Sequence, residues 1–206
     1  MTQSKFQKSA KPSGDQGFTL IEVMIAIVVM SVGILAVIAS FATAVAATQS
    51  AQEDLIARQK VLEAMESIYT ARNSQQLPFA AVANVSNGGI FLDGAQTLKC
   101  AGPDGLVNTG DDVNCTTQAG ATCPDNGAEC MVLPGNDGIL GTADDVTMSL
   151  GNFRRTIAIT PTTYPTGPNA GQVNPNMMAI SITITYTKAG IPARSFTANG
   201  LITSYH

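Results

Sequence analysis

The chain has 206 residues, of which 45% are hydrophobic and only 13% are charged, and its mean hydropathy of +0.16 is high for a soluble protein. The formal net charge is −4, from 11 basic and 15 acidic residues. Proteins that bind nucleic acids usually carry a basic patch, so this composition excludes a typical nucleic-acid-binding domain. The length is that of one or two domains.

The first 17 residues form a short polar segment with a positive side-chain charge. Lys5, Lys8 and Lys11 oppose a single acid, Asp15. Positively charged flanks of a membrane helix stay on the cytoplasmic side. We therefore expect the chain beyond the apolar segment that follows to lie outside the cytoplasm.

Residues 18–47 form a continuous apolar segment with one ionisable group, Glu22. Thirty helical residues span about 45 Å, whereas the hydrocarbon core of a bilayer is about 30 Å thick. The segment is too long for a secretory signal and lacks a clear A-x-A-like cleavage site, so we predict a transmembrane helix. A carboxylate in such a helix costs about 2.5–3.5 kcal/mol at the centre and less near the edge. Glu22 is therefore a candidate functional residue, the alternative being an acid solvated by lipid headgroups.

The start of this segment resembles a known processing site. Residues 17–26, GFTLIEVMIA, look like the cleavage site of type IV prepilins and pseudopilins, and residues 28–35, VVMSVGIL, are similar to PilV-type minor pilins. The resemblance implies that prepilin peptidase cleaves between Gly17 and Phe18 and that the new Phe18 amine is N-methylated. It also implies that Glu22 pairs with the Phe18 amine of a neighbouring subunit, which makes other pilin subunits the expected partners.

The helical period continues beyond the apolar segment, so residues 48–73 are predicted to form the amphipathic, periplasmic half of the same helix. Asn73-Ser74 and Leu77-Pro78 give the stop signal. Asp54 and Arg58 are expected to pair at i, i+4 on the solvent side. The apolar residues expected to pack in the core are Leu55, Leu62, Met65 and Tyr69.

Residues 74–206 are predicted to form a β-rich domain. Apolar and polar residues alternate over 153–160 and 178–187, as in half-buried strands. A third strand is expected over 194–205 with a bulge near Asn199-Gly200, and residues 161–175 are expected to form a loop. Three such strands need a cover, which the outer half of the helix supplies. The predicted class is an α+β, type IV pilin-like fold, with a long N-terminal helix on a small antiparallel sheet and a loop-rich, disulfide-containing middle region.

Four cysteines, Cys100, Cys115, Cys123 and Cys130, lie in the middle region. An even number in an exported segment predicts two disulfides. Three pairings are possible, of which we favour the sequential one. A zinc site is the weaker alternative, because there is no C-x-x-C sequence and the only histidine is the terminal His206.

Two acidic segments, residues 102–113 (GPDGLVNTGDDV) and 135–146 (GNDGILGTADDV), match at seven of twelve positions. Oxygen ligands and uncompensated negative charge favour Ca²⁺, so we predict a calcium site. The alternative is two solvated acidic turns, since the EF-hand pattern is missing. The candidate ligands are Asp104, Asp111, Asp112, Asp137, Asp144 and Asp145.

No combination of nucleophile and base stands out, so we expect no enzymatic activity. The leading hypothesis is a structural minor pilin, held in the bacterial inner membrane by a single span and then incorporated into a pilus. The first alternative is a pseudopilin of a type II secretion system, which shares the helix and the processing site. The second is a calcium-dependent adhesive or ligand-binding module carried on a pilin stem.

Overall fold

The computed structural model describes residues 17–117, 120–188 and 191–204. The predicted leader lies outside the described residues except for Gly17. The chain divides into two compact units, residues 1–49 and 50–206. Helix α1, Leu20–Asn73, contributes to both units.

In the first unit, α1 carries its apolar side chains exposed all around. No described residue from 17 to 49 is buried, and Phe18 is 81% exposed. This is the one described helix that is long and apolar enough to cross a membrane. A helix that is hydrophobic on every side needs an apolar environment around it, as the sequence analysis predicted.

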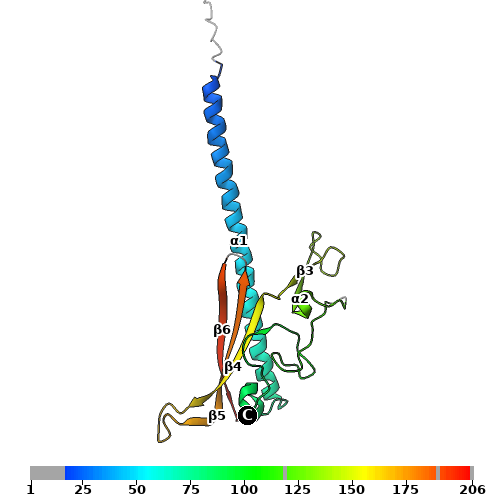
Figure 1. The fold of residues 1–206 in the computed structure, drawn as a ribbon, viewed down its shortest axis with the longest axis vertical. Helices are drawn as coiled ribbons and strands as arrows, with labels where there is room; N and C mark the ends of the chain where they lie inside the picture. Colours follow the sequence, from blue (N-terminus) through cyan, green and yellow to red (C-terminus); the bar gives the residue numbers. More distant parts are fainter. Residues whose placement is uncertain (1–16, 118–119, 189–190, 205–206) are drawn as a thin grey trace, which may run out of the picture. The chain divides into compact units, whose positions relative to one another are not determined.

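In the second unit, the rest of α1 packs on a four-stranded antiparallel sheet with the order β1-β4-β5-β6 (Figure 1). This arrangement confirms the predicted α+β, type IV pilin-like fold. The strands are β1 Gln96–Thr97, β4 Phe153–Thr163, β5 Val173–Lys188 and β6 Ile191–Thr203.

The sheet faces the helix with the side that the alternation predicted. Ile180, Ile182 and Ile184 of β5 are at most 1% exposed, whereas the Ser and Thr residues between them are more accessible. On β4 the buried set includes a cation, Arg155, which is 1% exposed. The sheet therefore buries a charge as well as apolar surface.

The predicted helix face was partly wrong. Met65 is buried, but Leu55 and Leu62 are 66% and 59% exposed. The helix instead turns its small residues, Ala57 and Ala64, fully into the core. Small side chains allow close packing of the helix in the core. A search for large apolar residues at helical spacing overlooks such alanines. The buried face comprises Ile56, Ala57, Lys60, Val61, Ala64, Met65, Ile68, Ala71 and Arg72.

The predicted Asp54–Arg58 pair was wrong, because within the described part of the chain the two side chains bind other partners. Asp54 reaches the sheet, where it accepts hydrogen bonds from the Tyr186 hydroxyl at 2.6 Å and from Arg194 Nη1 at 2.8 Å. The Arg58 guanidinium lies 5.2 Å from the centre of the Phe196 ring. Both side chains therefore tie the helix to β5 and β6, which local spacing alone does not reveal.

The predicted bulge at Asn199-Gly200 was also wrong, since β5 and β6 stay in register there and shift only between Tyr186 and Lys188. The glycine at position 200 is explained by close packing against the helix. A Cβ at this position would lie 2.3 Å from the Tyr69 hydroxyl oxygen. The predicted 161–175 loop is shorter than expected, because β4 runs to Thr163 and β5 begins at Val173.

The middle region consists of short elements joined by loops. Two 3-10 turns, η1 Phe79–Ala81 and η2 Val85–Asn87, precede β1. The segment α2, Pro124–Gly127, follows it as a single turn in which Asp125 and Asn126 have left-handed φ values of 56° and 59°, so it is not a regular α-helix. Strands β2 Cys130–Leu133 and β3 Val146–Ser149 form a separate two-stranded antiparallel sheet.

Candidate functional site

The predicted cleavage position lies in exposed chain just before α1. Gly17 and Phe18 are both exposed and neither is helical. The helix begins at Leu20, and the Glu22 amide donates to the Thr19 carbonyl at 3.1 Å and to the Thr19 hydroxyl at 3.3 Å. Thr19 therefore caps the helix. The spacing Thr-x-x-Glu is the sequence of a capping box, a signal that the sequence analysis did not use.

Glu22 lies in the first turn of α1 and is exposed. The amino end of a helix carries partial positive charge, which favours an acid in the first turn. Its carboxylate therefore has a local partner in the helix end and remains accessible to another molecule. The pairing of Glu22 with a neighbouring subunit stays a prediction.

The cysteines form the sequential pairs, Cys100–Cys115 and Cys123–Cys130. The first disulfide encloses the whole 102–113 repeat in a 15-residue separation. The second joins the residue before α2 to the first residue of β2, at the base of the hairpin that carries the 135–146 repeat. The first repeat is therefore closed in a covalent loop, whereas the second is anchored covalently only through the start of β2.

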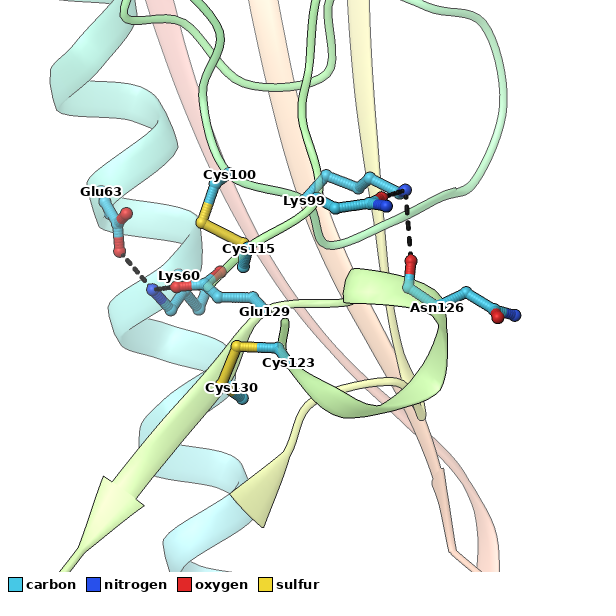
Figure 2. The surroundings of a disulfide bond; sticks show 10 residues. Lys60, Glu63, Lys99, Cys100, Cys115, Cys123, Asn126, Glu129 and Cys130 are labelled. Carbon is cyan, nitrogen blue, oxygen red and sulfur yellow. Dashed lines mark hydrogen bonds and ion pairs between the residues drawn. A yellow bond between two sulfur atoms is a disulfide. The ribbon is translucent and has the colours of Figure 1, made fainter. Parts of the chain in front are cut away.

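A buried ion pair lies beside the two disulfides (Figure 2). Lys60 of α1 donates to Glu63 at 2.8 Å and also to Glu129, which precedes β2. Burial lowers the pKa of Lys60, but the hydrogen bonds to Glu129 and Glu63 outweigh it, and the net pKa is raised. The pair thus holds Lys60 in its charged form and links the helix to the disulfide region.

The acidic residues of the first repeat, hereafter the first loop (102–113), bond mainly to their own loop. Asp104 Oδ1 accepts the Leu106 amide at 2.8 Å, and Asp111 Oδ1 accepts the Thr109 hydroxyl at 2.7 Å. Asp112 Oδ2 accepts the Asn108 amide at 2.8 Å. These bonds explain why acids occur at these positions, because each carboxylate satisfies a backbone or hydroxyl donor in a tight turn.

The second repeat, hereafter the second loop (135–146), repeats this geometry. Asp137 Oδ1 accepts the Ile139 amide at 2.8 Å, and Asp144 Oδ1 accepts the Thr142 hydroxyl at 2.7 Å. Asp145 Oδ2 accepts the Gly141 amide at 2.7 Å. The two loops therefore share most of their carboxylate hydrogen bonds, although Asp112 Oδ1 also accepts the Thr109 amide.

The threonine hydroxyls set the acidity of the exposed acids. The Thr109 hydroxyl lowers the pKa of Asp111, and the Thr142 hydroxyl lowers the pKa of Asp144. Asp112 differs, since burial raises its pKa more than its hydrogen bonds and Arg155 lower it. Within the described part of the chain, no three Asp, Glu, His or Cys side chains are placed to hold one metal ion. Calcium binding by the six aspartates stays a prediction.

Arg155 is a site residue that the sequence analysis missed. Its Nε donates to Asn108 Oδ1 at 3.3 Å, and Asn108 is fully buried. Burial lowers the pKa of Arg155, while the nearby Asp112 raises it. The signal was present, because strand alternation places Arg155 on the same face as Phe153 and Ile157.

Residues 12–38 match the family model described as the prokaryotic N-terminal methylation motif. No curated protein and no solved structure matches the chain. The motif coincides with the exposed Gly17-Phe18 bond and with the apolar start of α1, which fits membrane anchoring. The match supports a type IV pilin-like or pseudopilin-like structural subunit.

Proposed function

We propose that this chain is a minor subunit of a type IV pilus. Prepilin peptidase removes the leader at Gly17, the Phe18 amine is methylated, and α1 carries the subunit from the inner membrane into the filament. Glu22 neutralises the Phe18 amine of the next subunit. A bare amine and a bare carboxylate are each costly in an apolar environment, and pairing offsets much of that cost.

One observation supports this proposal above all others. The methylation motif over residues 12–38 coincides with a helix that exposes apolar side chains on every side. Such a helix is stable only in lipid or against other apolar helices. A subunit that moves from a membrane into a helical filament core meets both environments.

The same observation also supports a pseudopilin of a type II secretion system, because the processing site and helix are common to both. Deletion of the gene distinguishes the two functions. Loss of surface pili with intact enzyme secretion supports the minor pilin. Loss of secretion with normal pili contradicts it and supports the pseudopilin.

Mass spectrometry of the native N-terminus tests the processing step. We expect a chain that begins at Phe18 and carries one methyl group on its amine. A native chain that retains residues 1–17 would contradict the proposal and leave a single-span membrane anchor as the alternative.

A Glu22→Gln variant tests the assembly step. We expect normal membrane insertion and cleavage but reduced recovery in sheared filaments, since the uncharged amide cannot neutralise the neighbouring amine. Glu66→Gln is the matched control, because Glu66 is an exposed acid on the same helix outside the apolar segment. Equal recovery of both variants in sheared filaments would contradict the pairing role of Glu22.

A further inference from the structure

The hairpin formed by β2, β3 and the second loop, residues 130–149, is here named the arm. Its tip exposes two adjacent apolar side chains, Ile139 at 60% and Leu140 at 61%. Below the tip, the cross-strand partners Leu133 and Val146 are 39% and 58% exposed. The arm thus concentrates apolar side chains outside the domain core.

The first loop shows how the equivalent apolar side chains are buried when another surface covers them. Leu106 and Val107 occupy the same repeat positions as Ile139 and Leu140, yet they are only 3% and 7% exposed and belong to the core. The local turns do not account for this difference in burial, since the two loops share four carboxylate hydrogen bonds and a φ of 70° at their Asp-Gly glycines. They differ in that Asp112 Oδ1 also accepts the Thr109 amide. What differs is whether a surface covers the tip.

The surface that covers the first loop is apolar with a buried cation. Leu106 and Val107 join the core formed by the helix and the sheet, and Arg155 donates to Asn108 of the same loop. Arg155 also lies close enough to Asp112 for a favourable charge interaction. A surface that receives this kind of loop therefore combines an apolar pocket with a basic group.

The negative charge of the arm also favours a partner surface that carries a basic group. Residues 131–153 contain three acids and no base. Contact between the arms of two copies would bring together like charges. The groove on α1 that holds Leu55 and Leu62 also contains Glu63, Glu66 and Asp104 against one base, Arg58, so it repels the arm as well. An anionic lipid surface is disfavoured for the same reason.

The arm is already ordered for docking. The Cys123–Cys130 disulfide fixes the base of β2, and the tip is held by its own hydrogen bonds, such as Thr142 to Asp144. A preorganised loop loses little conformational entropy on binding, which leaves more of the contact free energy for affinity.

From these relationships we propose that the arm docks on another protein, inserting Ile139 and Leu140 into an apolar pocket edged by lysine or arginine side chains. The partner resembles the seat of the first loop within this chain. This inference does not depend on the filament function, because it rests on the arm alone.

Site-specific photocrosslinking in the native host identifies the partner. Benzoylphenylalanine replaces Leu140 in the full-length chain, and the matched control places it at Val173, which is equally exposed at 60%. We expect a protein adduct at 140 that is missing at 173, with the crosslinked peptide next to a lysine or arginine. Adducts only with lipid, only with a second copy of this chain, or equal at both positions overturn the proposal.

Binding of the purified adduct partner to the full chain in nanodiscs then tests the contact. Ile139→Ser with Leu140→Ser is expected to weaken affinity by about tenfold or more, and Val173→Ser is expected to leave it unchanged. Affinity is expected to fall as salt rises, because acidic and basic groups meet at the edge. Unchanged affinity of the double variant, or affinity independent of salt, overturns the proposal.

Discussion

Arg155 Nε and Asn108 Oδ1 lie 3.3 Å apart inside the core, where strand β4 meets the first loop. Arg155 is 1% exposed and Asn108 is fully buried. A buried acceptor that loses its donor costs about 1–3 kcal/mol. This contact therefore adds to the burial of Leu106 and Val107 in holding the first loop in the core.

Arg155→Leu is expected to lower the free energy of unfolding by about 1–3 kcal/mol, measured by urea denaturation of a fragment that begins at Ser50, where the second compact unit starts. Arg154→Ala is the control, since Arg154 is the exposed neighbour on the other face of β4. Adding Asn108→Gly should recover part of the loss, because it removes the orphaned acceptor and suits the φ of 67° at this position. Equal losses for Arg155→Leu and Arg154→Ala would contradict the role of the contact.

Thr109→Val and Thr142→Val are expected to raise the pKa values of Asp111 and Asp144, respectively, because each variant removes the hydroxyl that lowers them. NMR titration of the carboxyl carbons measures these values. A folded-state pKa below the unfolded value contributes stability that is present above the unfolded pKa and lost as pH falls through the folded pKa. The free energy of unfolding of both variants should therefore fall less than that of the parent as the pH is lowered through the acid range. Unchanged aspartate pKa values would refute the assignment.

Removal of the disulfides tests how the repeats are fixed. Replacing Cys100 and Cys115 together by Ala is expected to cost about 3 kcal/mol of unfolding free energy, and replacing Cys123 and Cys130 about 2.4 kcal/mol. The difference follows from the sequence separations of 15 and 7 residues, since a longer loop loses more entropy when it is closed. Urea unfolding of the oxidised parent provides the reference. A larger loss for the shorter loop would contradict this reasoning.

The Lys60–Glu129 pair predicts a loss of stability at alkaline pH. The pKa of Lys60 is raised in the folded chain, so its contribution is fully present below the ordinary lysine pKa of about 10.4 and lost as pH rises through the folded value. Tyr186, whose pKa is also raised, adds a loss in the same direction. Lys60→Met should remove only the lysine part, which pH-dependent thermal melts measure. An identical alkaline profile for parent and variant would disprove the role of the pair.

Calcium binding by the acidic loops is tested on the full chain in nanodiscs. If a loop binds the ion only when folded, excess Ca²⁺ raises the thermal midpoint relative to chelator. We expect this increase to be reduced by Asp144→Asn, since Asp144 is exposed in the second loop. A midpoint that is the same in calcium and in chelator would remove the predicted site and leave two hydrogen-bonded acidic turns.

Much of the architecture followed from local patterns. The alternation over β4 and β5 correctly assigned the buried faces, because side chains in a strand point to opposite sides in turn. The buried face of the helix was less predictable. Leu55 is 66% exposed and Ala57 is fully buried, because burial depends on the distant strands that share the core with the helix.

The sequence by itself determined the apolar helix, the processing motif and the strand pattern, because each depends on residues close together in the chain. Tertiary structure decided which of two nearly identical loops is buried. Leu106 belongs to the core, where Arg155 of β4 donates to Asn108 of the same loop, whereas Ile139 has a similar local loop and is exposed within the described chain. A repeat fixes its own shape through local hydrogen bonds, while its burial depends on what the rest of the fold places against it.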